Sequence, residues 1–384
     1  MIIKNGNVFG ENGQFSRGSI VIADGRFVEI VGENTGLDDK DDVIDATGLY
    51  VIPGMVDIHF HGCVGYDFCD GTEEAFDAIT KYQAQNGVTS ISPATMTLSR
   101  EELTGIFRAA GKYVAAYREN TGDTGSTIRG ITMEGPFVSL AKKGAQNGAY
   151  IHVPDVEFYH EMQELSGGLI KQVAVAPEED TDLAFTKEIS KETVISVAHT
   201  TANYDIADKA FEAGATHVTH LFNAMPAFLH RDPGVVGAAS DHEKVFVELI
   251  CDGVHIHPAM VRSMFTLFGA ERICMISDSM MATGMSDGNY SLGGQAVTVQ
   301  GKLATLADGT IAGSASNLHD CLKVAVLEMG ISLEEAVLAC TQTPARSLGL
   351  EDVCGSISVG KTADLVLLDE ELNIKLIVKN GKKI

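Results

Sequence analysis

The chain has 384 residues, of which 28 are Lys or Arg and 52 are Asp or Glu, so its formal net charge is −24. Such an acidic chain offers no basic surface for nucleic-acid phosphates or for an anionic membrane, and we expect neither as a partner. Hydrophobic residues make up 45% and charged residues 21%, which is typical of a folded globular protein and not of a disordered one.

Both ends of the chain predict short β-strands. The N-terminal segments MIIKNGNVF, GSIVIADGRFVEIVG and DVIDATGLYVIPG alternate apolar and polar residues, with Asn-Gly and Asp-Gly pairs at the turns. The closing GSISVGKTADLVLLDEELNIKLIVKNGKKI has the same pattern. Because chain ends often lie close together, we expect one small β-sandwich domain built from residues 1–53 and 354–384.

The middle of the chain alternates strand and helix patterns. Eight strands are expected, at residues 51–60, 88–95, 127–135, 170–177, 192–199, 215–221, 244–252 and 272–278. Helical patterns lie between most of them, including residues 73–86, 100–117 and 204–213. This α/β rhythm predicts a (β/α)8 TIM-type barrel over residues 54–353.

An open doubly wound sheet is the alternative, but no GxGxxG motif follows an early strand to support its dinucleotide-binding form. The Gly-rich region 284–312 predicts a hairpin inserted after the eighth strand. The opening residues lack a basic segment followed by an apolar one, and no apolar run approaches the ~18 residues of a membrane span, so we expect a cytoplasmic protein. Seven cysteines without CxxC spacing predict reduced, mostly buried thiols.

Metal-capable side chains recur where the expected strands end, which is where barrel enzymes carry their reactive groups. They are His59 and His61 after the first strand, Glu134 after the third, His199 after the fifth, His220 after the sixth and Asp278 after the eighth. Each alone has a structural explanation, such as a core histidine, a salt-bridge acid or a turn cap. Together, neutral imidazoles and a carboxylate form the ligand set of a catalytic divalent metal.

These residues lie in motifs that resemble a known family. The segments DIHFHG, MEGPF, VAHT, THLFNAMP, RDPG, CDGVHIHP, ISDSM and IAGS occur in this order. They resemble the amidohydrolase superfamily and, within it, the N-acetylglucosamine-6-phosphate deacetylases. TPARSLGL and GSISVGKTADLVLLD look like the usual end of such a chain, so the resemblance covers nearly all of it.

The resemblance implies a set of metal ligands. Glu134, His199 and His220 would bind the metal that every member needs, and His59 and His61 are similar to a pair that helps hold a second ion. A Glu here replaces the carboxylated Lys that bridges two ions in other relatives. We expect Zn²⁺, with Fe²⁺ or another divalent ion as alternatives, and the choice between one and two ions per subunit stays open, with two favoured.

The implied reaction is hydrolysis of the acetamide of N-acetyl-D-glucosamine 6-phosphate to D-glucosamine 6-phosphate and acetate, in amino-sugar catabolism or cell-wall recycling. Asp278 would act as general base and then as general acid. His255 would donate to the carbonyl oxygen as negative charge develops there. A buried structural histidine is the alternative interpretation of His255, and His257 beside it has less support.

Substrate contacts are implied at further positions. They are Ala145, Gln146, Asn223, Ala224, Arg231, His255, Ile311, Ala312 and Gly313. Arg231 is similar to an arginine that reaches the phosphate in the neighbouring subunit, which implies a homodimer; a surface pair with Asp232 is the alternative. Gln146 stands where many members have His, so the choice between the glucosamine and the galactosamine epimer stays open.

Three other functions are compatible with parts of the pattern. They are deacetylation of N-acetylgalactosamine 6-phosphate, hydrolysis of a cyclic amide or deamination of a nucleobase, and a non-catalytic scaffold. The net charge of −24 also opposes an anionic substrate. We therefore expect the acids on outer faces and local cations at the site: the metal, Arg231, His230 and Lys143.

Overall fold

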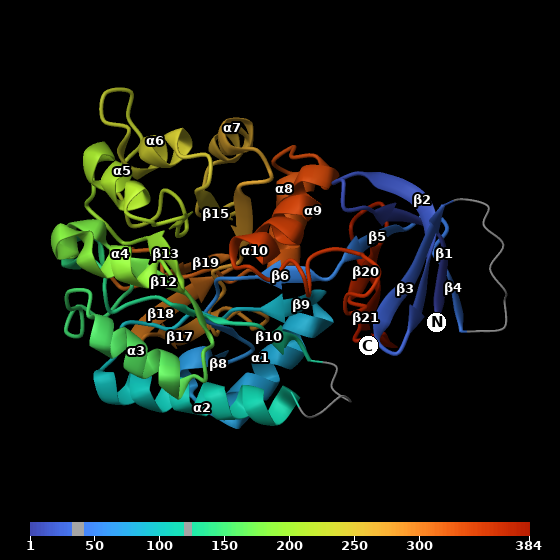
Figure 1. Cartoon of the computed structure of the whole chain (residues 1–384), viewed down its shortest axis with the longest axis horizontal. Helices are drawn as coiled ribbons and strands as arrows, with labels where there is room; N and C mark the ends of the chain where they lie inside the picture. The colour runs from blue at the N-terminus through green and yellow to red at the C-terminus, as the bar shows by residue number, and fades with distance from the viewer. Residues whose placement is uncertain (33–41, 119–124) are drawn as a thin grey trace.

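Strands from both ends of the chain share one sheet, at the right of Figure 1. The computed structural model describes residues 1–32, 42–118 and 125–384. The sheet has the order β22-β21-β20-β5-β1-β2-β3, with β4 also paired to β1. Its strands are β1 (Ile2–Phe9), β2 (Phe15–Ala23), β3 (Arg26–Gly32), β4 (Val43–Asp45), β5 (Tyr50–Pro53), β20 (Leu365–Leu368), β21 (Ile374–Lys379) and β22 (Lys382–Lys383). The two termini contribute strands to the same domain, as expected. These strands form one hydrogen-bonded sheet, whereas the expected β-sandwich would have two separate sheets.

Parallel strands occupy the middle of the chain, as predicted. One sheet has the order β10-β9-β6 and the other runs from β11 to β16. Their bounds are β6 (Met55–Asp57), β9 (Val88–Ile91), β10 (Thr127–Ile128), β11 (Ile131–Met133), β12 (Ile170–Val175), β13 (Val194–Val197), β14 (His217–Val218), β15 (Phe246–Ile250) and β16 (Ile273–Ile276). Their mostly apolar, buried residues are typical of parallel strands covered on both faces. The arrangement is consistent with a TIM-type domain.

Two expected strands are divided. The segment 127–135 forms β10 and β11, which pair with different neighbours, and 51–60 passes from β5 in the small sheet to β6 in the parallel one. Gly54 lies at that passage, where a Cβ atom would stand 2.1 Å from Thr89 Oγ1. Only glycine permits this close approach of the backbone to its neighbour.

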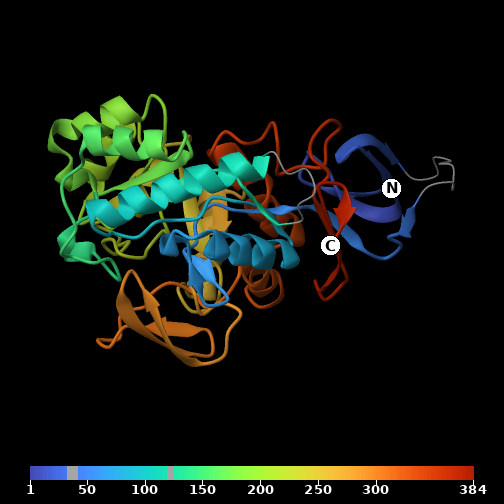
Figure 2. The same cartoon turned by 90° about the horizontal axis from the view of Figure 1, so that it is seen from below.

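Helices connect most of the parallel strands and cover them from outside (Figures 1 and 2). They are α1 (Glu73–Gln85), α2 (Arg100–Arg118), α3 (Val156–Leu165), α4 (Ala184–Ile189), α5 (Tyr204–Glu212), α6 (Gly234–Asp241), α7 (Pro258–Phe268), α8 (Leu318–Leu327), α9 (Leu333–Cys340) and α10 (Gln342–Ser347). Thr72 and Asn203 accept backbone N–H groups at the starts of α1 and α5. The three helices expected from sequence are therefore present, within about one residue of their predicted ends.

The Gly-rich insertion contains three strands, so the expected hairpin has one more strand than predicted. They are β17 (Gly288–Leu292), β18 (Gln295–Gln300) and β19 (Leu303–Thr305). Figure 2 shows this orange sheet projecting from the parallel strands. Leu292 and Val297 pack against Met96 and Met280 in a separate apolar cluster. A short hairpin, β7 (Gly62–Cys63) with β8 (Tyr66–Asp67), follows the first parallel strand.

The thiols follow the prediction from the sequence. All seven cysteines are free, and each is buried except Cys69, which is half-buried. Across residues 1–32, 42–118 and 125–384, the helices are too short or too polar to cross a membrane.

Candidate metal centre and active site

The structure brings the predicted strand-end residues together. His59 and His61 follow β6, Glu134 follows β11, His199 follows β13, His220 follows β14 and Asp278 follows β16. Three of them adopt left-handed backbone conformations, with φ of 42° at His199, 28° at His220 and 48° at Asp278. Such a conformation costs about 1–3 kcal/mol per non-glycine residue, so the surrounding structure must compensate for it.

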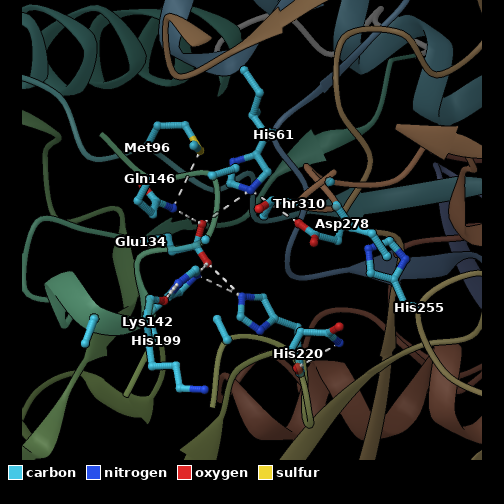
Figure 3. Close-up of a pocket in the computed structure, with 18 residues that line it drawn as sticks. His61, Met96, Glu134, Lys142, Gln146, His199, His220, His255, Asp278 and Thr310 are labelled. Carbon is cyan, nitrogen blue, oxygen red and sulfur yellow. Dashed lines mark hydrogen bonds and ion pairs between the residues drawn. The ribbon is translucent and has the colours of Figure 1, made fainter. Parts of the chain in front are cut away.

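Glu134 lies at the centre of the group (Figure 3). Its Oε1 atom is 3.1 Å from Nε2 of both His199 and His220, and 3.5 Å from Nε2 of His59. Its Oε2 atom is 3.4 Å from His61 Nε2. The Glu134 side chain is only 2% exposed, so four imidazoles surround a buried carboxylate.

The spacing and a free lone pair fit a divalent metal. His199 Nε2 and His220 Nε2 are 3.1 Å apart, and each is 3.1 Å from Glu134 Oε1. Neighbouring ligands of a tetrahedral ion with bonds of about 2.0–2.1 Å are ~3.3 Å apart. His59 Nε2 is buried with no hydrogen-bond partner among the described residues. Two groups of ligands result, His59–His61–Glu134 and Glu134–His199–His220, which share Glu134.

Asp278 faces the same centre from the last parallel strand. Its Oδ1 lies 3.3 Å from His61 Nε2. Burial raises the pKa of Asp278, but the hydrogen bond and the charge of His61 outweigh burial, and the net pKa is below its ordinary value. Asp278 is therefore placed as an ionised acid beside the ligands.

His255 is held by a buried carboxylate. Its Nδ1 lies 2.8 Å from Asp252 Oδ2, and Asp252 also accepts the backbone N–H of His255 and of Val254 and the hydroxyl of Ser314. Burial lowers the pKa of His255, but the hydrogen bond and charge of Asp252 outweigh burial and raise it above the ordinary value. Because Asp252 occupies Nδ1, only Nε2 is left to serve a ligand.

A cavity of about 380 Å³ opens over the metal-capable residues. Most of the predicted site residues line it: His61, Glu134, Ala145, Gln146, His199, His220, Asn223, Ala224, His255, Asp278, Ile311 and Gly313. His59 is fully buried behind this lining, and so is Ala312. Arg231 does not line the cavity; its side chain is exposed and its Nη1 lies 2.6 Å from His230 Nε2.

Gln146 lines the cavity, yet both ends of its amide are already engaged. Nε2 donates to Glu134 Oε2 at 2.7 Å, and Oε1 accepts the backbone N–H of Thr97 at 2.6 Å. The residue expected to contact the sugar therefore orients the central carboxylate.

Three charged residues of the site were not singled out from the sequence. Lys142 lines the cavity, whereas the sequence pointed to its neighbour Lys143. Glu248 and Asp252 are buried carboxylates that accept from His59 and His255. A single acid within the apolar strand FVELI was the available indication for Glu248. His257, the weaker partner of His255, accepts the N–H of Ala259 at the start of α7.

The fold and this ligand set define a class of protein. The model of the amidohydrolase family matches residues 50–384. The chain belongs to the amidohydrolase family, whose members are metal-dependent.

Several of its relatives are deacetylases of phosphorylated amino sugars. N-acetylglucosamine-6-phosphate deacetylase of Bacillus subtilis (strain 168) is 35% identical over 99% of this chain and 96% of its own length. N-acetylgalactosamine-6-phosphate deacetylase of Escherichia coli O157:H7 is 32% identical over 86% of each chain. The crystal structure of N-acetyl-D-glucosamine-6-phosphate deacetylase from Mycobacterium smegmatis matches with a TM-score of 0.92 and 32% identity, over 100% of both chains.

We predict that replacing Asp252 by Asn lowers the pKa of His255. The substitution preserves the size of the side chain but removes the charge that stabilises the imidazolium. The pKa of His255, followed by NMR titration of its ring protons, should lie above ~6.5 in the natural chain and fall in the variant. Asp241→Asn, a change of an exposed acid, is the control. Equal values in the natural chain and in Asp252→Asn would refute the role of Asp252.

Proposed function

We propose that the chain hydrolyses the acetamide of N-acetyl-D-glucosamine 6-phosphate to D-glucosamine 6-phosphate and acetate, in amino-sugar catabolism or cell-wall recycling. The observation that carries the proposal is the geometry of one cavity, in which the Glu134–His199–His220 ligand set faces Asp278 and His255. The similarity of the whole chain to the Bacillus subtilis deacetylase supports the choice of substrate.

The chain's own residues supply proton transfer and charge stabilisation. A divalent ion bound by Glu134, His199 and His220 would provide Lewis acidity and a water of lowered pKa. Asp278, ionised beside the ligands, would take a proton from the attacking water and deliver it to the leaving nitrogen. His255, whose Nδ1–H is committed to Asp252, can donate from Nε2 to the carbonyl oxygen only when its ring is protonated. Its raised pKa supports this role.

We expect Zn²⁺, with Fe²⁺ or another divalent ion as alternatives. Imidazole nitrogen and carboxylate oxygen are ligands that zinc accepts readily. Two ligand groups share Glu134, so we propose two ions per subunit, with His59 and His61 serving the second.

The substrate's phosphate and sugar would be held around the rim of the cavity. Asn223 and Ala224 come shortly after His220 in the chain, and Lys142 adds a cation to the lining. Ile311 and Gly313 also line the cavity, with Ala312 buried between them. N-acetylgalactosamine 6-phosphate is the second candidate substrate, because a relative of comparable similarity carries that name.

We propose that Arg231 serves a neighbouring subunit in a homodimer. Two observations support this assignment: Arg231 does not line its own cavity, and large apolar side chains near it are exposed. Phe228 and Leu229, close to it in the chain, are 40% and 55% exposed. Large apolar side chains exposed together often mark a protein interface.

The closure of the parallel strands and the division into two domains can also be proposed. We propose that the parallel strands close into one (β/α)8 barrel over residues 54–353, with residues 1–53 and 354–384 as the small β domain. Hydrogen bonds across both seams support closure, since Ala94 bridges to Thr132 and the N–H of Asp278 donates to the carbonyl of His59 at 3.0 Å. A cytoplasmic location would suit a small-molecule metabolic enzyme.

The direct test is acetate release. Zinc-loaded protein should release one acetate per N-acetylglucosamine 6-phosphate, treatment with a chelator should abolish turnover, and added Zn²⁺ should restore it. N-acetylgalactosamine 6-phosphate, assayed in parallel, ranks the two epimers. Absence of acetate together with turnover of a cyclic amide would reassign the chain within its family.

Replacing Asp278 by Asn should lower kcat by ~10²-fold or more while leaving the metal content unchanged, because the amide cannot carry the proton. Metal analysis and steady-state kinetics on the same sample separate the two effects, with Asp241→Asn as a surface control. Near-normal turnover in the metal-loaded variant would exclude Asp278 as the acid–base group.

Replacing Arg231 by Ala should raise KM for the phosphorylated sugar by ~10–100-fold, the scale of a lost hydrogen bond to a charged group. Metal content and kinetics with unphosphorylated N-acetylglucosamine should not change. Arg108→Ala, on the exposed face of α2, is the matched control. An unchanged KM for the phosphorylated sugar would remove Arg231 from the site.

A further inference from the structure

Glu248 is a fully buried carboxylate behind the metal-capable residues. It lies on β15, is 0% exposed, and does not line the cavity. Its Oε2 accepts from His59 Nδ1 at 2.9 Å and from the backbone N–H of His220 at 3.2 Å. Its Oε1 accepts from Gln172 Nε2 at 2.6 Å and lies 3.5 Å from His217 Nδ1. Donors surround the group on every side, which is the environment of an ionised carboxylate.

The contact with His59 determines which ring nitrogen can bind a metal. An ionised carboxylate only accepts hydrogen bonds, so His59 Nδ1 must carry a proton, and the neutral ring then keeps its lone pair on Nε2. Nε2 points to the centre, 3.5 Å from Glu134 Oε1 and 3.9 Å from Asp278 Oδ1. Carboxylates that receive the second N–H of a ligating histidine commonly fix its tautomer and orientation.

The same oxygen also holds the other ligand group. His220 adopts the left-handed conformation, with φ of 28°, and its N–H points to Glu248 Oε2. This hydrogen bond stabilises a backbone conformation that the residue would otherwise disfavour. One oxygen atom thus contacts a ligand from each of the two groups, His59–His61–Glu134 and Glu134–His199–His220.

We infer that Glu248 is a positioning residue that fixes one ligand of each group through a single buried carboxylate. The inference rests on the metal centre of the proposed function. It goes beyond that function because it makes the two groups dependent on one residue outside the cavity. Disturbing Glu248 should therefore affect the whole centre without removing a ligand.

The test compares the natural chain with Glu248→Leu, both free of metal. Leucine has a similar volume but offers no acceptor, so His59 Nδ1 loses the oxygen that fixes its proton. We expect the ring proton to move to Nε2, which lies 3.5 Å from Glu134 Oε1. ¹⁵N NMR of the histidine rings should show His59 protonated on Nδ1 in the natural chain and on Nε2 in the variant. Zinc affinity, measured by calorimetric titration of metal-free protein, should fall by ~10–100-fold.

Two controls separate positioning from general destabilisation. Asp180→Asn changes another buried carboxylate, which accepts the N–H groups of Phe185 and Thr186 far from the centre, and should leave both readouts unchanged. Glu248→Asp retains the charge and should keep the proton of His59 on Nδ1.

The position of the His59 proton decides the outcome. A His59 ring that keeps its proton on Nδ1 in Glu248→Leu overturns the inference even if zinc affinity falls, because that fall would then be a loss of packing. If Glu248→Leu does not fold, the natural chain alone suffices, since a His59 Nδ1 without a proton there overturns the inference. A natural chain that binds no zinc would refute the proposed metal centre instead, which the titration shows separately.

Discussion

The negative charge of Glu134 is almost wholly buried, so hydrogen-bond donors or positive charges must compensate for its lost hydration. The rest of the site depends on this requirement. Removing an ionised carboxylate from water without partners costs far more than a folded domain can supply. Here four imidazoles lie within 3.5 Å of its two oxygens. Parallel strands that end at one edge can deliver such a set, because each strand end contributes one or two side chains to the same point.

Further polar side chains hold the residues of the site in place. Glu248 holds His59, Asp252 holds His255, and Gln146 holds Glu134 itself. The first two contacts leave Nε2 of each histidine available, toward Glu134 for His59 and toward the cavity for His255, and the third orients the Glu134 carboxylate. The backbone is strained at the same site, since His199, His220 and Asp278 adopt left-handed conformations just after their strands end.

Most acidic residues of the chain lie away from the cavity. Only eight Asp or Glu side chains are buried among the described residues, and only Glu134 and Asp278 belong to the cavity lining. The acid excess therefore lies on outer positions, as the sequence predicted. At the cavity, Lys142 and the histidines face any anion, so the local charge differs from the net charge of −24.

Several features could be predicted from the chain alone, and each had a local cause. Alternating strands with tight turns at both ends predicted the shared sheet, and the strand–helix rhythm predicted the parallel strands. The residues that end those strands predicted the group around Glu134. The division of residues 127–135 into β10 and β11 was not predictable, because the pattern of one strand does not record which neighbour it pairs with.

The sequence by itself therefore determined the class of fold, the metal-capable residues and the family, because these depend on periodicity and on the order of residue types along the chain. Only the tertiary structure decided that Gln146 turns its amide to Glu134, that Glu248 holds both His59 and His220, and that Arg231 lies away from its own cavity. The physical reason is that a side chain's partner depends on distances across the folded chain. Residues 59, 172, 220 and 248 lie far apart in the chain, and folding alone brings their hydrogen-bonding atoms together.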